Sequence, residues 1–332
     1  MSSPSPSERQ GRRKTNLLGA LVVAVALGLV AAAAFVLGDD GPTGGDTASE
    51  RAWTSAPAMP HRRSYSASAK VGGDIYVAAG MVGNTGRPLD LFERFDVSRN
   101  EWTSLPGVPK AFSAGAAAAL DGLMYVVGGN SDEADGRQVL VYDIEKERWS
   151  ERAPLPAPRT NLAVVAHEQK IYALGGLDPV DATNTVFVYD PMRDRWSHAA
   201  PLPEALHALA AVSFRGEIWA IGGRVKPGVG EVSRRIWIYN ASRDRWRAGP
   251  SMPEPVETHG AAVVDDRIHV VLESLYLIYD ARESRWTRGP SQRVPRHALV
   301  LFNAGGRLYA IGGCTVPQLE DSTVVESIAS GS

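Results

Sequence analysis

Cysteine, clustered positive charge and catalytic motifs are all scarce in this sequence. Cys314 is the single cysteine among 332 residues, so no disulfide can form within the chain. Lys and Arg are interleaved with Asp and Glu, and the net charge of −2 gives no basic footprint for a nucleic acid. The chain also lacks a nucleophile elbow, a Cys–His arrangement, a phosphate-binding glycine loop and clustered metal ligands. We therefore expect no nucleic-acid partner, no cofactor and no metal, and support for catalysis is thin.

Tryptophan, by contrast, recurs at a nearly constant interval. The steps between successive members of the series are 49, 47, 47, 50 and 40 residues. The six positions are Trp53, Trp102, Trp149, Trp196, Trp246 and Trp286. A unit of this length is typical of a four-stranded sheet that cannot bury both of its faces alone. The copies are therefore expected to pack around an axis as propeller blades.

The same short phrases surround most of these tryptophans. An aromatic residue followed by an acid or amide precedes the tryptophan, as in Tyr142-Asp143 and Tyr189-Asp190. A glycine pair such as Gly128-Gly129 stands earlier in the unit, and a proline-bounded turn follows the tryptophan. These signals predict four short strands, with a small apolar strand innermost and the tryptophan on the outer strand. Each tryptophan then fills the widening wedge between blades, so a core role is favoured over binding.

The glycine pair, the tyrosine–acid pair and the tryptophan, in this order, resemble the Kelch repeat. The resemblance covers residue 51 to about residue 328, and it implies an all-β fold, a six-bladed Kelch-type β-propeller. Two units depart from the pattern. The first has Ala79-Gly80 in place of two glycines, and the fifth has Val271-Leu272 followed by a shortened stretch.

The two ends of the chain predict how the ring is completed. The last unit has its glycine pair, Gly312-Gly313, but no tryptophan follows Trp286. The segment around Trp53 is followed by a proline-bounded turn, yet no other strand of a unit precedes it. We therefore expect this N-terminal strand to close the last blade, which removes the exposed edges of an open array.

The first 50 residues predict a membrane attachment. Residues 1–14 form a basic cytoplasmic tail, 15–38 a transmembrane or signal-anchor helix, 39–50 a flexible linker, and 51–332 the propeller. The uncharged run has the roughly 20 residues that span a bilayer, and the basic residues before it place the propeller outside the cell membrane. The alternative is a cleaved signal peptide and a secreted propeller.

Topology predicts one face for the function. The segments that lead into the inner strands and the loops that follow the glycine pairs lie at the same end of up-and-down blades. Arg63, Arg159 and Arg296 occupy equivalent positions there in blades one, three and six. Such guanidinium groups predict an electropositive rim for an anionic sugar or an acidic peptide. The alternative is that each arginine only pairs with an acid or a carbonyl in its turn.

Histidines and loop residues extend this candidate site. His207, His259 and His297 lie at or near inner-strand starts, where hydrogen bonding in the turns is favoured over metal binding. The loops add Asn130, Asp178 and Arg224. In blade five the loop shrinks to Glu273-Ser274, which predicts a gap in the rim where a ligand or partner could enter.

Two functions follow from these observations. The first is a membrane-tethered, extracytoplasmic module that binds an unknown protein or anionic glycan through its loop face. The second is a carbohydrate-active enzyme, similar to the sialic-acid mutarotases or the galactose oxidases that share this architecture. An enzyme predicts an enclosed cavity in which an acid such as Glu257 or Glu273 approaches Arg159 or Arg296. A shallow, open rim favours a partner surface.

Overall fold

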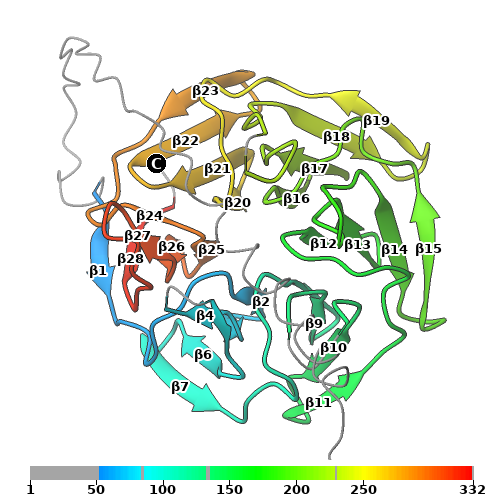
Figure 1. Ribbon diagram of the computed structural model, residues 1–332. Helices are drawn as coiled ribbons and strands as arrows, with labels where there is room; N and C mark the ends of the chain where they lie inside the picture. Colours follow the sequence, from blue (N-terminus) through cyan, green and yellow to red (C-terminus); the bar gives the residue numbers. More distant parts are fainter. Residues whose placement is uncertain (1–51, 84–85, 132–134, 229, 331–332) are drawn as a thin grey trace, which may run out of the picture.

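Six four-stranded antiparallel sheets are arranged around a central axis in the computed structural model (Figure 1). The structure describes residues 52–83, 86–131, 135–228 and 230–330. Within these ranges it contains strands, turns and loops and no helix, so the predicted all-β six-bladed propeller is confirmed. None of the described segments is a helix able to cross a bilayer. The predicted tail, helix and linker over residues 1–50 lie outside the described residues.

The blades follow one another along the chain, and each runs from an inner to an outer strand. Blade 1 contains β2 (Ala67–Val71), β3 (Asp74–Ala78), β6 (Phe92–Asp96) and β7 (Glu101–Leu105); blade 2 contains β8 (Ala116–Leu120), β9 (Leu123–Val127), β10 (Val139–Asp143) and β11 (Arg148–Glu151). Blade 3 contains β12 (Ala163–His167), β13 (Lys170–Leu174), β14 (Val186–Asp190) and β15 (Arg195–Ala199); blade 4 contains β16 (Ala210–Phe214), β17 (Glu217–Ile221), β18 (Ile236–Asn240) and β19 (Arg245–Ala248). Blade 5 contains β20 (Gly260–Val264), β21 (Arg267–Leu272), β22 (Leu275–Asp280) and β23 (Arg285–Arg288).

Blade 6 is built from both ends of the described chain. Its inner strands are β25 (Val300–Ala304), β26 (Arg307–Ile311) and β28 (Val325–Ala329), and its outermost strand is β1 (Thr54–Ala56). Strand β1 pairs antiparallel with β28, with Thr54 opposite Ser327 and Ala56 opposite Val325. Two short pairs complete the structure: β4 (Met81–Val82) with β5 (Arg87–Pro88), and β24 (Arg296–His297) with β27 (Cys314–Thr315).

The tryptophans link neighbouring blades at the periphery. The indole nitrogen donates to a backbone carbonyl of the preceding blade in four cases: Trp53 to Pro290 (2.9 Å), Trp102 to Pro57 (2.9 Å), Trp196 to Ala153 (2.8 Å) and Trp246 to Ala200 (2.8 Å). Each acceptor lies four residues after the tryptophan of its own blade. The rings also pack on the third-strand tyrosines, as Trp246 does on Tyr239 with ring centroids 4.9 Å apart. The predicted core role therefore includes a polar contact between blades.

A ring of backbone hydrogen bonds joins all six blades on the side of the glycine pairs. In each bond a residue after the second strand donates to the residue that leads into the next blade: Gly80 to Phe112, Gly129 to Arg159, Gly176 to Leu206, Gly223 to Val256, Glu273 to Arg296 and Gly313 to Arg63. We call this the glycine ring. At Gly176 a Cβ would lie 2.7 Å from the carbonyl oxygen of Thr160, and φ is +91°. Glycine is therefore needed for both space and conformation.

A second chain of backbone hydrogen bonds surrounds the axis itself. The donors and acceptors are Ala114 to Tyr65, Asn161 to Ala114, Ala208 to Asn161, Thr258 to Ala208 and Ala298 to Thr258. All six residues have positive φ values between 49° and 55°. No bond from Tyr65 to Ala298 completes the circle among the described residues. This axial ring is therefore open between blades 6 and 1.

Candidate functional site

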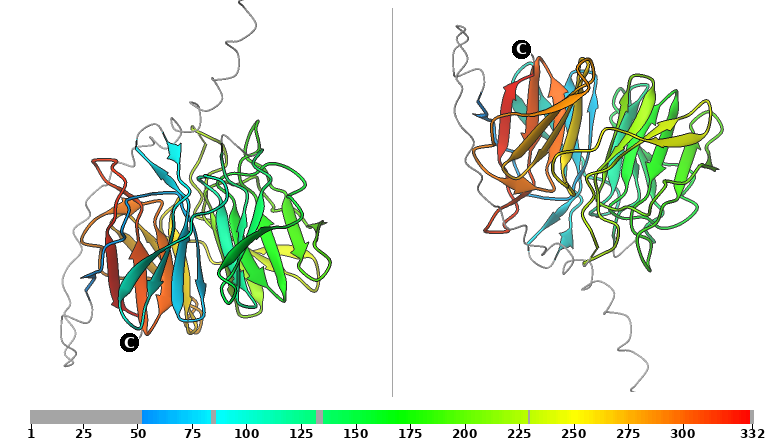
Figure 2. Two further views of the ribbon diagram at one scale, coloured as in Figure 1. Left: turned by 90° about the horizontal axis from the view of Figure 1, so that it is seen from below. Right: turned by 90° about the horizontal axis from the view of Figure 1, so that it is seen from above.

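The two sets of segments predicted to share one end of the propeller do meet there. Backbone bridges join Ser113 to Asn130 and His207 to Arg224, and β24 pairs with β27. In each case a residue that leads into an inner strand contacts the loop after the second strand. We call this end the loop face; Figure 2 shows the blades from the side, with strands running between it and the opposite face.

Arg63 and Arg296 lie beneath the loop face, and each has a buried carboxylate partner, although Nε of Arg63 makes no hydrogen bond among the described residues. Arg63 is 1% exposed and forms an ion pair with Glu93. Arg296 is 0% exposed, and its Nη2 lies 3.0 Å from Oε2 of Glu326. Both guanidinium groups also donate to backbone carbonyls. Their charges are balanced inside the blade, as the structural alternative in the sequence analysis described, so these two residues add no net charge to the loop face.

Arg159 differs from its two counterparts because blade 3 has no carboxylate at the equivalent position. Glu93 and Glu326 are the second residues of β6 and β28, and Phe187 is the second residue of β14. The guanidinium carbon of Arg159 lies 5.1 Å from the centroid of the Phe187 ring, a cation–π contact. No ion pair to Arg159 occurs among the described residues.

The hydrogen bonding of Arg159 is also incomplete. Its Nη1 donates to the carbonyl of Pro158 at 2.6 Å, whereas Nε is buried without a partner. Burial lowers the pKa of Arg159, and the negative charge of Asp178 opposes that shift. A buried guanidinium without an ion-pair partner is costly, so the site is poised to accept an anion.

Arg224 is balanced by a residue that leads into blade 5. Its Nε lies 2.7 Å from Oε2 of Glu257, and Nη2 contacts the other carboxylate oxygen, which makes the pair bidentate. Arg224 also donates to the carbonyl of Gly230 at 2.6 Å. The hydrogen bonding of the Arg224 guanidinium to the Glu257 carboxylate is the main cause that raises the pKa of Arg224. This pair is a rigid, neutral element of the loop face.

The three histidines are largely buried. Burial lowers the pKa of His259 to about 3, and it lowers those of His207 and His297. Neither ring nitrogen of His259 makes a hydrogen bond among the described residues, so the hydrogen bonding in the turns that the sequence favoured does not occur there. Within those residues no group of three or more His, Cys, Asp or Glu side chains is arranged to hold a metal ion.

Asn130, Asp178 and Glu273 occupy the loops, as the sequence indicated. Asp178 accepts from the backbone N–H groups of Val180 and Asp181, and this hydrogen bonding lowers its pKa. Asn130 pairs with Ser113 through its backbone. Glu273, and not Leu272 as the sequence suggested, takes the position of the second glycine in blade 5, with φ at +50°, and burial raises its pKa. Only Glu273 and Ser274 separate β21 from β22.

Two further residues at the axis had not been singled out from the sequence. Tyr65 is an aromatic residue at an axial-ring position where the other blades have Ala, Asn or Thr. Burial, with the charges of Cys314, Glu257 and Asp321, raises its pKa, so the phenol stays a hydrogen-bond donor. Asp321 accepts from Ser64 Oγ at 2.5 Å and from the Gly83 N–H at 2.7 Å. Alignment of the six axial positions would have revealed Tyr65; Asp321 has no comparable repeat signal.

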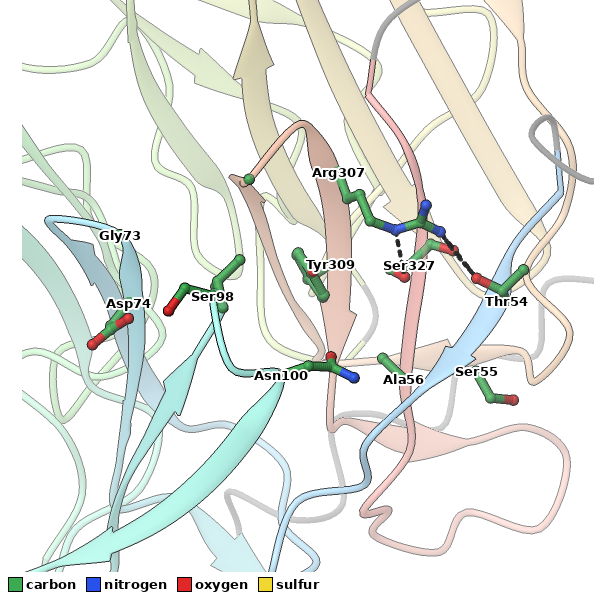
Figure 3. Close-up of a pocket in the computed structure, with 12 residues that line it drawn as sticks. Thr54, Ser55, Ala56, Gly73, Asp74, Ser98, Asn100, Arg307, Tyr309 and Ser327 are labelled. Carbon is green, nitrogen blue, oxygen red and sulfur yellow. Dashed lines mark hydrogen bonds between the residues drawn. The ribbon is translucent and has the colours of Figure 1, made fainter.

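A hollow lies on the opposite face of the described structure. It has a volume of about 870 Å³, opens to solvent and is formed between blades 6 and 1 (Figure 3). A second hollow, of about 670 Å³, lies beside Asp265, Asp266 and Ser330. Neither is the enclosed cavity around Arg159 or Arg296 that the enzyme alternative predicts.

Comparison with known proteins identifies the repeat. Residues 65–272 match the family model described as the KLHDC2/KLHL20/DRC7 Kelch-repeats domain. The chain belongs to the Kelch-repeat family. This Kelch propeller is also similar to the solved structure titled "Structure of YjhT", with a TM-score of 0.71 and 16% sequence identity over 81% of this chain and 95% of that one. At this identity the likeness shows the fold alone. No curated protein matches the chain.

Proposed function

We propose that this Kelch propeller is a membrane-tethered, extracytoplasmic module that binds an anionic group of a protein or glycan on its loop face. The observation that carries the proposal is Arg159. Blades 1 and 6 balance the equivalent arginine with Glu93 and Glu326, whereas blade 3 has Phe187 there. A ligand carboxylate or sulfate would supply the missing charge and use a guanidinium that is already held in place.

The direction of β1 supports a loop face that is free to bind when the chain is tethered at its N-terminus. The backbone N–H of Met59, just after β1, bonds to Thr323 at the loop-face end, whereas that of Ser330, just after β28, bonds to Gly306 at the opposite end. Because β1 and β28 are antiparallel, the chain enters blade 6 at the opposite face and runs toward the loop face. An anchor over residues 15–38 would therefore hold the opposite face toward the membrane and turn the loop face outward.

Rigidity is a further argument for recognition at this face. The glycine ring fixes the backbone beneath the loops of all six blades. Loops carried by such a scaffold can vary in sequence while the supporting strands keep their geometry. Arg159, the Arg224–Glu257 pair and Tyr65 then present a cation, a neutral ion pair and a hydroxyl donor to one partner.

The test compares three variants of the full chain in detergent on an array of anionic glycans and acidic peptides. Arg159→Leu removes the cation, and Phe187→Glu supplies an internal carboxylate as in blades 1 and 6. We expect each to weaken binding by about tenfold or more. Phe187→Leu, which removes the ring without adding charge, is the matched control and should retain binding. Binding that survives both charge-removing variants, or no binding by the parent chain, would overturn the proposal.

A further inference from the structure

The hollow between blades 6 and 1 on the opposite face is walled by polar side chains from both ends of the chain. Blade 6 contributes Thr54, Arg307 and Ser327, and blade 1 contributes Ser98 and Asn100 (Figure 3). We call it the seam groove. It lies at the far end of the blades from Arg159, so it is separate from the loop-face site.

The junction between blades 6 and 1 lacks a latch that joins blades 2 and 3, and blades 3 and 4, at the same place. Between blades 2 and 3, a carboxylate oxygen of Asp194 accepts from the hydroxyl of Tyr189 at 2.5 Å and from the N–H of Ala153 at 2.9 Å. Between blades 3 and 4, Asp244 makes the same two bonds with Tyr239 and Ala200, at 2.6 and 2.7 Å.

At the seam groove all three parts of this latch are replaced. Phe95 stands in place of the tyrosine and has no hydroxyl; Pro57 stands in place of the alanine and has no N–H. Asn100 takes the place of the aspartate, with φ at +57° as in the latch residues. Its amide makes no hydrogen bond among the described residues and lines the groove instead.

Arg307 is held in position on the blade 6 wall. Its Nε donates to Ser327 Oγ at 3.0 Å, and Nη2 donates to Thr54 Oγ1 at 3.0 Å and to the Ser327 carbonyl at 3.3 Å. Nη1 has no acceptor among the described residues. Three bonds therefore fix a guanidinium with one edge unused, so little side-chain entropy remains to be lost when a ligand binds.

We propose that the seam groove is a binding site for a neutral, hydroxyl-rich saccharide. Its walls alternate donors and acceptors: serine and threonine hydroxyls, the Asn100 amide and the free edge of Arg307. The lining holds one cation, Arg307, and one anion, Asp74, which also lies 3.8 Å from Arg94; this lining suits a ligand of low net charge. Tyr309, Val97 and Ala56 add apolar surface for the carbon face of a sugar ring.

The test uses the full chain in detergent on an array of neutral oligosaccharides, followed by titration of the glycan bound most strongly. Ser98→Trp places a large ring in the groove and leaves Arg307 intact. Arg307→Met removes the guanidinium. Ser242→Trp is the matched control, because Ser242 holds the same turn position in blade 4 and bonds to Asn240 as Ser98 bonds to Asp96.

The proposal predicts that Ser98→Trp and Arg307→Met each weaken binding by about tenfold or more, while Ser242→Trp stays within about twofold of the parent. Arg159→Leu should leave this binding unchanged, which separates the seam groove from the loop-face site. Two outcomes overturn it: the parent binds no neutral glycan, or Ser98→Trp binds as well as Ser242→Trp. Either can occur while the loop-face proposal holds.

Discussion

The indole nitrogen of Trp53 donates a hydrogen bond of 2.9 Å to the carbonyl oxygen of Pro290, 237 residues away along the chain. The same kind of bond, from Trp102 to Pro57, joins this N-terminal segment to blade 1 on its other side. Trp53 also packs edge-on against Tyr276, with ring centroids 5.6 Å apart. The segment around Trp53 is thus hydrogen-bonded to blade 5 on one side and to blade 1 on the other.

Replacement of Trp53 by Phe should lower the free energy of unfolding by about 2 kcal/mol, because the hydrogen bond is lost and the smaller ring leaves a void. The control is Trp149→Phe, because the indole nitrogen of Trp149 is buried without an acceptor. It should cost about 1 kcal/mol less. Urea denaturation measures both, and equal losses would show that the bond to Pro290 contributes nothing.

The buried pair of Arg63 and Glu93 gives a second prediction. Arg63→Ala should destabilise the protein by about 3 kcal/mol, because the buried carboxylate of Glu93 loses its cation and keeps only the contact with Nδ1 of His61 at 2.7 Å. Blade 2 has Phe112 and Leu140 at the two equivalent positions. The double change Arg63→Phe and Glu93→Leu should therefore recover more than half of the loss. If the double variant unfolds as readily as Arg63→Ala, the unpaired carboxylate is not the cause.

The latch carboxylates predict a loss of stability in acid. The hydrogen bond from Tyr189 and then that from the Ala153 N–H lower the pKa of Asp194, and Asp244 is lowered in the same way. Because the folded pKa lies below the unfolded value, their stabilisation is present above about pH 4 and is lost as pH falls through the folded pKa.

The double variant Asp194→Asn and Asp244→Asn should be less stable than the parent at neutral pH by about 1 kcal/mol at each site, because the amide oxygen accepts the same two bonds without the charge that strengthens them. The difference should shrink below about pH 3. Urea melts across this pH range test it. Asp121→Asn is the control, because Asp121 also has a positive φ, of 50°, and is exposed. A difference that stays constant with pH would contradict the assignment.

Glu273 predicts the opposite dependence on pH. Burial raises the pKa of Glu273, so ionisation of the carboxyl opposes folding above the unfolded pKa. Glu273→Gln should therefore be more stable than the parent at neutral pH, and this advantage should disappear as acid protonates the parent. Glu168→Gln, at an exposed position with φ of 46°, should show no such gain. A Glu273→Gln variant that is less stable at neutral pH would overturn the prediction.

The repeat made the architecture predictable, whereas the charge balance of the site depended on contacts across a blade. The tryptophan interval and the glycine pairs are periodic, so they indicated six blades and the equivalence of Arg63, Arg159 and Arg296. The residue opposite each arginine lies on the third strand, about 30 positions later, and only its side-chain direction shows that Glu93 and Phe187 play opposite roles. The sequence shows that Glu93 and Phe187 hold equivalent positions in blades 1 and 3. It does not show that each of them contacts an arginine.

The seam groove was not predictable in the same way. It lies where Pro57, Phe95 and Asn100 stand in place of the residues that form the latch between blades 2 and 3 and between blades 3 and 4. None is unusual by itself, and the latch that they replace became visible only from the hydrogen bonds of Asp194 and Asp244. The residues that line the seam groove come from two blades and form no sequence motif.

The propeller is joined differently at its axis and at its glycine ring where blade 6 meets blade 1. The glycine ring is continuous, because the bond from the Gly313 N–H to the Arg63 carbonyl closes it between blades 6 and 1. The five axial bonds stop between Ala298 and Tyr65. The axial ring is therefore interrupted at a junction where the glycine ring is not. Radial strain applied at the loop face would therefore separate blades 6 and 1 at the axis more easily than other neighbouring blades. Tyr65 and Ala298 are the two ends of this open chain, so a partner bound at the loop face could move them apart without breaking an axial hydrogen bond.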